Sequence, residues 1–209
     1  MQTLTLFGQQ NLDFRSRNVR EFVVQKCKRE DVVQFVEKWH YSHSINGLMI
    51  SVCFRLLCDG EMIGACIFGK LGMANAWRKY GESEDEVIEL RRLCCIDSTP
   101  KNTESYFIGH CLRWLKQNTT IKTIVSYADP NHGHQGTIYR ASNFEYKGLT
   151  SEGRVIIMDG KQYHDKAIRT KYNGELKPFA KRLSDALESG NAHYEKQKGK
   201  HIYVYSLAL

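Results

Sequence analysis

The pair Asp59-Gly60 separates two apolar runs, residues 49–58 and 62–68. An Asp-Gly pair between two strand-like runs is a strong short-range signal for a β-hairpin, because both residues tolerate the left-handed backbone that a tight turn requires. The sequence therefore predicts two long antiparallel strands in the first third of the chain. The elements before and after the hairpin then decide the fold class.

Helices and strands alternate on both sides of this hairpin. Residues 29–43 carry apolar side chains at helical spacing, and Asn46-Gly47 provides a stop. Further elements are expected as strands at 87–96, 121–128 and 154–160, a helix at 103–117, a short helix in "HQGTIYRAS", a short strand in "FEYKGL", a helix in "LKPFAKRLSDALES" and a last strand in "KHIYVYSL". This order, which mixes a hairpin with strand–helix–strand crossovers, predicts an α/β fold with a central mixed β-sheet flanked by helices.

The size and composition of the chain fit one domain. With 209 residues, 42% of them hydrophobic, we expect a single domain over 1–209, with 150–209 as a basic C-terminal part of it. No apolar stretch is long enough to cross a membrane, and the N-terminus lacks a secretory pattern, so we expect a cytoplasmic protein. The seven cysteines include no CxxC pair, which favours reduced, buried thiols over a zinc site.

The net charge of +7 is concentrated in the second half of the chain, where lysines and arginines alternate with Tyr and His. Such a surface can contact a phosphate backbone, or it can simply keep the protein in solution. If it binds DNA, the residues expected to contact phosphates are Lys166, Arg169, Lys171, Lys181, Arg182, Lys196, Lys198 and Lys200.

An unusual density of ionisable groups follows the predicted strand at 121–128, in "SYADPNHGHQG". Ligands of open α/β sheets bind beyond the carboxyl ends of strands, which points to a functional role for Asp129. Asp129 could orient a histidine, accept a proton or bind a metal, although Asp-Pro is also a common turn opener. Ser126 could hydrogen-bond the reacting group. His132 and His134 give only weak support for a metal site.

Two further clusters could supply chemistry. His40 and Tyr41 lie at the end of the first helix, where His40 could act as a base or ligand, or could merely bond helix carbonyls. We expect the latter for His43. Arg91 and Arg92 lie on a predicted strand, so alternation places one on each face, and one of them could bind a phosphate or carboxylate of a group donor.

The segment "IYRASNFEYKG" resembles the motif A-x-x-x-Y-x-x-x-G-F-x-x-x-G of the general control N-acetyltransferase (GNAT) fold, with Tyr139, Asn143-Phe144 and Gly148 at comparable places. The resemblance implies that Tyr139 acts as the general acid for the leaving group; a packed aromatic is the alternative. The stretch "CCIDSTPKNTESYFIG" lacks the glycine-rich Q/R-x-x-G-x-G/A loop of that fold, whose backbone N–H groups hold a pyrophosphate. A coenzyme A site of the usual kind is therefore not expected.

A larger set of segments resembles the Mom proteins of bacteriophages, a branch of the same fold: "WHYSH", "IELRRLCCIDSTPKNTESYFIGHCLRWLK", "SYADPNHGHQGTIYRASNF" and "KGKHIYVY". The resemblance implies conversion of adenine in double-stranded DNA to an N6-carbamoylmethyl (glycinamide-type) adenine, which protects DNA from restriction. It also implies catalytic roles for His40, Tyr41 and Asp129, iron at these same three residues, and Arg92 as the better candidate for donor binding.

The sequence leaves the group donor open between an acyl-coenzyme A and an aminoacyl-tRNA. A target base inside a duplex must be flipped out, and Trp39, Tyr41 and Trp77 could form the surface that receives it. Two other functions remain compatible with the sequence: an acetyltransferase that uses acetyl-coenzyme A on an amine, and a DNA-binding module without catalysis.

Overall fold

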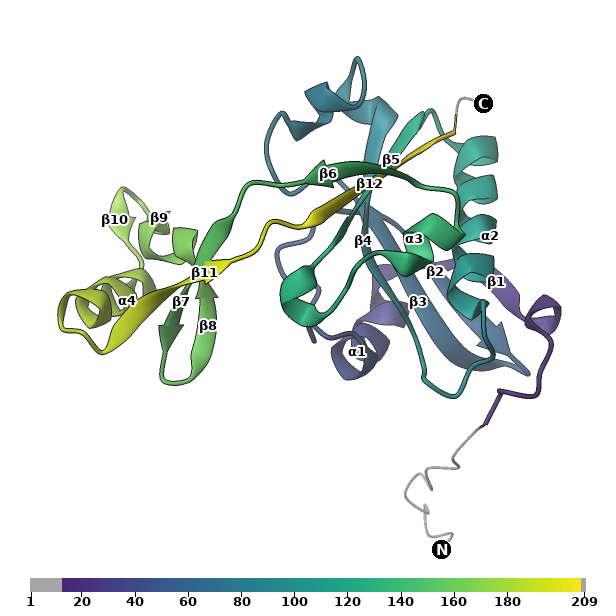
Figure 1. The fold of residues 1–209 in the computed structure, drawn as a ribbon, viewed down its shortest axis with the longest axis horizontal. Helices are drawn as coiled ribbons and strands as arrows, with labels where there is room; N and C mark the ends of the chain where they lie inside the picture. The colour runs from purple at the N-terminus through teal and green to yellow at the C-terminus, as the bar shows by residue number, and fades with distance from the viewer. Residues whose placement is uncertain (1–12, 208–209) are drawn as a thin grey trace, which may run out of the picture. The chain divides into compact units, whose positions relative to one another are not determined.

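The computed structural model describes residues 13–207 and confirms the mixed α/β class (Figure 1). The chain divides into two compact units. Unit 1 contains the residues up to Tyr127, Gly136–Tyr146 and the residues from Tyr203 on; unit 2 contains Ala128–Gln135 and Lys147–Ile202. That these units make up one domain stays a prediction.

Unit 1 is built around the seven-stranded sheet, in which the strands lie in the order β1-β2-β3-β4-β5-β12-β6. The strands are β1 (Val23–Cys27), β2 (Ile50–Cys58), β3 (Glu61–Gly69), β4 (Val87–Cys95), β5 (Thr123–Ala128), β6 (Glu145–Leu149) and β12 (His201–Ser206). Asp59 and Gly60 join β2 to β3 with φ of 50° and 84°, which confirms the predicted tight hairpin. β1 to β4 pair antiparallel, and β4 pairs parallel to β5.

Two helices cover opposite faces of this sheet. Helix α1 (Arg29–Trp39) buries Val32 and Val36 against Ala65 and Ile67 of β3. Helix α2 (Thr103–Asn118) brings Trp114 against Phe54 of β2, which in turn meets Phe68 of β3. Ile67 and Phe68 are consecutive in β3 and therefore point to opposite faces. The short helix α3 (Thr137–Ala141) follows β5.

An irregularity in β4 changes which way its side chains point. Phe68 pairs with Leu90, whereas its neighbour Ile67 pairs with Arg92, so Arg91 is an extra residue in β4. A β-bulge of this kind interrupts the alternation of side chains along the strand. Arg92 consequently lies on the α1 face with Ile67, whereas Leu90 lies on the α2 face with Phe68.

Unit 2 contains a three-stranded antiparallel sheet in the order β11-β7-β8, formed by β7 (Gly153–Met158), β8 (Lys161–His164) and β11 (Ala192–Gln197). Helix α4 (Pro178–Glu188) packs Leu183 against Ile156 and Met158 of β7. Between β8 and α4 lie η5 (Asp165–Arg169) and the short pair β9 (Lys171–Tyr172) and β10 (Glu175–Leu176).

Sequence reasoning missed β8, β9, β10 and β11. In β11 only Ala192 is buried, so the strand shows no apolar alternation. Strand β1 was predicted without bounds, and the other helices and strands agree with the prediction to within a few residues. The 3₁₀ helices η1 (Val19–Glu21), η2 (Ala76–Lys79), η3 (Glu84–Glu86) and η4 (Pro130–His132) lie in the connections.

Two further expectations concern the state of the cysteines and the presence of a membrane-spanning helix. All seven cysteines are free, and five of them are buried. Burial raises the pKa of the Cys27 thiol to about 12 and that of Cys53 to about 11, which keeps both protonated at neutral pH. Within residues 13–207 no helix combines the length and apolarity needed to cross a membrane.

We predict that Gly136→Ala destabilises the protein by about 2–5 kcal/mol, because Gly136 has φ of +74° and an added Cβ would overlap the ring of buried Tyr203. Gly47 is the matched control, since it has the same φ of +74° but open space around it. Gly47→Ala should cost only about 1–2 kcal/mol. Denaturant unfolding measures both, and equal costs would contradict the packing of Tyr203 on Gly136.

Candidate active site

The sheet of unit 1 opens between β4 and β5, and we call this opening the fork. The parallel pairing between the two strands ends at Leu90 and Ser126. Beyond this pair, β4 remains paired only with β3, up to Cys95, while β5 lies beside β12. The fork lies on the carboxyl side of both strands, where α/β sheets bind ligands.

A buried carboxylate lies beside the fork. Glu89 is 9% exposed, and its Oε2 accepts a hydrogen bond from Arg91 Nη1 at 2.6 Å and one from the backbone N–H of Gly72 at 3.2 Å. Burial raises the pKa of Glu89, and the nearby Arg91 opposes this only in part. Sequence reasoning did not single out Glu89; the signal was an acid inside the otherwise apolar run "VIEL".

The two arginines of β4 have different surroundings. Alternation along a regular strand would place one on each face, but the bulge brings both to the α1 face: Arg92 pairs with Ile67, and Arg91 reaches Glu89, whose partner is Gly69. Arg92 donates from Nε to the carbonyl of Ser44 and from Nη1 to that of Arg91. Arg91 Nε, in contrast, is buried without a hydrogen-bond partner. Of the two arginines, Arg91 is therefore the one whose guanidinium has a hydrogen-bond donor left without an acceptor.

Ser126 and Tyr139 meet at the base of the fork. Ser126 is fully buried, and its hydroxyl is hydrogen-bonded to the side chain of Tyr139 on α3. Burial raises the pKa of Tyr139 to about 12, although the bond to Ser126 lowers it slightly. The phenol is thus protonated at neutral pH and can donate a proton. Tyr127, the next residue of β5, is hydrogen-bonded to Tyr80, and burial also raises its pKa.

His40 and Tyr41 follow α1 directly, and their rings stack with centroids 4.3 Å apart. His40 is 6% exposed, whereas Tyr41 is 42% exposed. The backbone N–H of Ser42 donates to His40 Nδ1 at 3.1 Å, and the Ser42 hydroxyl lies 2.9 Å from the same atom. A neutral ring that accepts at Nδ1 carries its proton on Nε2. His43 bonds the carbonyl of Glu37 at 2.8 Å, as expected for a histidine at a helix end.

Asp129 begins the segment of unit 2 that follows β5. Its Oδ1 accepts from the backbone and side-chain nitrogens of Asn131, and its Oδ2 pairs with Lys200 Nζ at 2.8 Å. Asn131 also exchanges two hydrogen bonds with the backbone of Lys198. Burial tends to raise the pKa of Asp129, but the bonds from Lys200 and Asn131 outweigh it and lower the pKa. The carboxylate is a poor base and a good anchor.

The iron implied at His40, Tyr41 and Asp129 does not fit these surroundings. Across residues 13–207 no three His, Cys, Asp or Glu side chains lie together as metal ligands would. Nδ1 of His40 accepts the Ser42 N–H, which leaves a hydrogen on the other ring nitrogen. Both carboxylate oxygens of Asp129 already bind cationic or N–H donors.

All eight residues predicted to bind DNA lie in unit 2 and are exposed. Two of them are neutralised locally, because Lys200 pairs with Asp129 and Arg182 with Asp159. The six without an ion pair among residues 13–207 are Lys166, Arg169, Lys171, Lys181, Lys196 and Lys198. The available positive charge is thus concentrated on η5, β9, α4 and the segment before β12.

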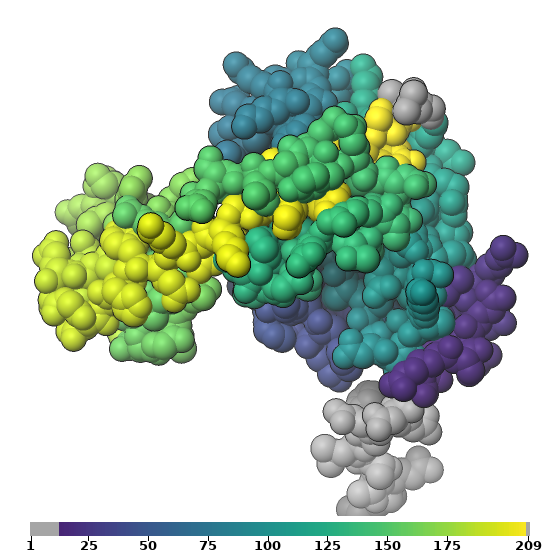
Figure 2. Space-filling model, viewed as in Figure 1, coloured from purple at the N-terminus to yellow at the C-terminus, as the bar shows by residue number. Residues whose placement is uncertain are grey.

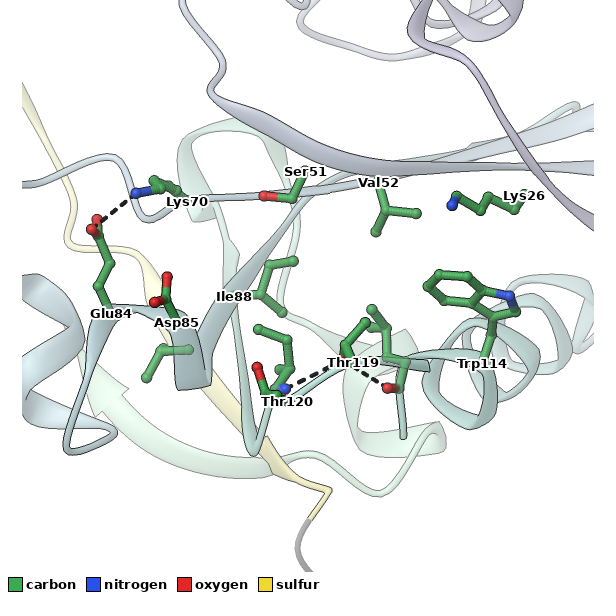
Figure 3. Close-up of a pocket in the computed structure, with 13 residues that line it drawn as sticks. Lys26, Ser51, Val52, Lys70, Glu84, Asp85, Ile88, Trp114, Thr119 and Thr120 are labelled. Carbon is green, nitrogen blue, oxygen red and sulfur yellow. Dashed lines mark hydrogen bonds and ion pairs between the residues drawn. The ribbon is translucent and has the colours of Figure 1, made fainter. Parts of the chain in front are cut away.

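A cavity of about 230 Å³ lies elsewhere in unit 1 (Figure 3). Trp114 and Lys26 lie at one end of it, and the Lys70–Glu84 ion pair lies at the other. Val52, whose strand partner Phe68 faces α2, helps to line it, so the cavity is on the α2 face. None of the predicted site residues lines it, and we assign the chemistry to the fork instead.

Comparison with known proteins shows which family this chain resembles. A model described as the Mom protein family matches residues 21–208. The protein named Methylcarbamoylase mom of Escherichia phage Mu is 29% identical over 108 residues, which cover 50% of this chain and 44% of that protein. The match thus spans less than half of the relative's length.

Solved structures agree on the fold. A ribosomal-protein alanine N-acetyltransferase of Escherichia coli matches with a TM-score of 0.50 at 10% identity, over 90% of this chain and 95% of that one. A variant of the spermidine N-acetyltransferase of Vibrio cholerae gives the same TM-score and coverage at 8% identity. These similarities confirm the GNAT fold predicted from the sequence, and they carry no information about substrate.

We predict that Lys200→Met destabilises the protein by about 1 kcal/mol at pH 7, since Lys200 is half exposed and its ion pair is partly screened. The Asp129 pKa is lowered in the folded protein, so its contribution to stability is present above the usual pKa of 3.8 and is lost as pH falls through the lower folded value. The loss of unfolding free energy that Lys200→Met causes should therefore become smaller below pH 4.

Thermal unfolding between pH 3 and pH 7 measures this pH dependence. Lys198→Met is the matched control, because only the backbone of Lys198 is bonded to Asn131. A difference between wild type and Lys200→Met that stays constant down to pH 3 would show that the ion pair does not stabilise the fold.

Proposed function

The chain belongs to the Mom protein family, and on that basis we propose that it converts adenine in DNA to N6-carbamoylmethyl adenine and so protects DNA from restriction. The observation that carries the proposal is that the family match covers the whole fork, with its buried acid, its proton-donating phenol and its unmet arginine donor. The name of the phage Mu relative describes the transfer of a methylcarbamoyl group, which has the same atoms as a carbamoylmethyl group.

The reaction begins with a new bond between N6 of adenine and the carbonyl carbon of an activated glycyl donor. The bond from that carbon to its thiol or hydroxyl leaving group breaks, and the leaving group departs with the electron pair. N6 releases one proton as the new bond forms, and the leaving group takes up another. The site must therefore hold a base on the DNA side and an acid on the donor side. The glycyl adenine formed in this way is an isomer of the product: its amine attacks C6, the bond between C6 and N6 breaks, and N6 takes up the proton that the amine releases, which leaves a carbamoylmethyl group.

Tyr139 supplies the acid in this proposal. Its O–H is protonated at neutral pH because burial raises its pKa to about 12, and Ser126 fixes the direction of the hydroxyl. Glu89 supplies the base. Burial raises its pKa and so strengthens it as a proton acceptor, whereas the pKa of Asp129 is lowered. We assign Asp129 to holding the loop after β5.

Two further groups position the donor. Arg91 Nε, which is buried and unpaired, can bind a carbonyl, carboxylate or phosphate oxygen of the donor. His40 presents an N–H at Nε2 and acts as a hydrogen-bond donor to charge that develops in the reaction. Tyr41, which is exposed beside it, can stack on the incoming base together with Trp39.

Two kinds of donor remain compatible with these groups, an acyl-coenzyme A and an aminoacyl-tRNA. The connection between β4 and α2 contains Pro100 and no glycine before Gly109. This disfavours a donor that is held by a pyrophosphate loop. Transfer of an acetyl group from acetyl-coenzyme A is the second candidate function, and the GNAT fold alone supports it.

The test is mass spectrometry of nucleosides from plasmid DNA of cells that express the protein. We predict a deoxyadenosine heavier by one carbamoylmethyl group, together with resistance of the plasmid to restriction enzymes that cut at adenine-containing sites. DNA with only ordinary nucleosides, from cells that contain folded protein, would contradict the proposal. An N-acetylated deoxyadenosine would favour the second candidate.

We predict that His40→Ala and Asp129→Ala both reduce the modified nucleoside by about 100-fold or more, because they remove a donor to the reacting group and the anchor of the loop after β5. Circular dichroism should show that both variants remain folded. Val23→Ala, an exposed position on β1 that we assign to no function, is the control and should retain most activity. Full activity in both alanine variants would overturn the site assignment.

A further inference from the structure

The loop between β3 and η2 carries the most exposed large apolar side chain of unit 1 among residues 13–207. Met73 is 62% exposed, whereas Leu71, two residues earlier, is only 7% exposed. Figure 2 shows the surrounding segment, in blue, on the outer surface of unit 1. Single exposed apolar side chains are common on protein surfaces, so the position of Met73 relative to the fork matters more than its exposure.

The position of Met73 relative to the fork is fixed through its neighbour. The backbone N–H of Gly72 donates to Oε2 of Glu89, and a Cβ on Gly72 would lie 3.0 Å from Nη1 of Arg91. Gly72 thus packs directly on the Glu89–Arg91 pair. Met73 is therefore anchored one residue away from the groups that we assign to the chemistry, with its side chain directed to solvent.

Two exposed cations follow Met73 on the same loop. Arg78 and Lys79 lie in η2, and neither forms an ion pair with any of residues 13–207. Arg78 also lies over the ring of Trp77 at 5.3 Å. Of the acids that follow, Glu84 pairs with Lys70 and Glu86 with Lys122, whereas Glu82 and Asp85 form no ion pair within residues 13–207. The cations nearer Met73 in the chain are therefore separated in sequence from these two acids.

We infer that Met73 is a wedge that enters the base stack of duplex DNA next to the target adenine and holds the space that the flipped base leaves. Proteins that unstack DNA insert apolar side chains, methionine among them, while nearby cations hold the phosphates. The anchoring of Gly72 on Glu89 and Arg91 places the wedge beside the fork, so unstacking occurs where the base is needed. This inference rests on the proposed function, because it assumes that the substrate is an adenine in DNA.

The first experiment uses four DNA duplexes that contain the fluorescent base 2-aminopurine as the probe, which follows a different one of the four bases in each duplex. The fluorescence of 2-aminopurine rises when it leaves the base stack. We predict that the wild-type protein raises the fluorescence of at least one duplex about tenfold, whereas Met73→Ala raises it little. Val23→Ala is the matched control, since Val23 is 51% exposed on β1, at the far edge of the same sheet.

The second experiment measures modified deoxyadenosine in plasmid DNA for the same variants. Met73→Ala should reduce it about tenfold at an unchanged thermal midpoint, because unstacking is then unassisted. Equal fluorescence in Met73→Ala and wild type overturns the wedge, and so does equal modification if the wild-type protein modifies its DNA. Fluorescence that depends on Met73 in a protein that forms no modified nucleoside supports the wedge but overturns the proposed reaction. Wild-type protein that leaves every probe quenched overturns the wedge.

Discussion

The candidate site depends on the point at which parallel pairing between β4 and β5 stops. Hydrogen bonding between these strands ends at Leu90 and Ser126, and the sheet opens there. The bulge at Arg91 turns Arg91 and Arg92 to the same face as Glu89 beside this opening. A regular strand would have placed Arg92 on the opposite face from Arg91, and Glu89 and the arginines could not have lined one side of the fork together.

The fork combines groups of opposite character. A buried acid with a raised pKa lies on the α1 face, and a phenol that remains protonated rests on Ser126. Acid–base catalysis at neutral pH requires two titratable groups with different surroundings. One group must remain able to accept a proton, and the other must remain able to donate one. The hydrogen bond from Gly72 adds a structural link, because the loop with Met73 is attached to the same acid.

Much of this fold could be predicted from local signals. Asp59-Gly60 specified the hairpin, and the spacing of Phe107, Ile108 and Cys111 specified α2. Strand β11 could not be predicted, because its side chains are exposed on both faces beyond Ala192 and show no alternation of buried and exposed positions. Tyr139, Ser126 and His40 were selected from motifs, and their roles stay predictions. The bulge at Arg91 leaves no mark in the sequence, so the common face of the two arginines was not foreseen.

Contacts between residues far apart in the sequence could not be predicted from local sequence patterns either. Asn131 bonds the backbone of Lys198 across 67 positions of sequence, and Lys200 pairs with Asp129 in the same place. A lysine that looked like a phosphate contact therefore holds a carboxylate instead. The charge that remains for DNA lies on η5, β9 and α4, where no acid pairs with Lys166, Arg169 or Lys171 among residues 13–207.

The claim that the fork is where the group is transferred is tested most directly by Tyr139→Phe. This change removes one hydroxyl and keeps the ring contacts with Phe144 and Tyr203, so the fold should be unaffected. The measurement is the amount of carbamoylmethyl deoxyadenosine in plasmid DNA at equal protein levels. The account predicts a loss of about 100-fold or more, as expected when a general acid is removed. Wild-type levels of the modified nucleoside would place the chemistry outside the fork.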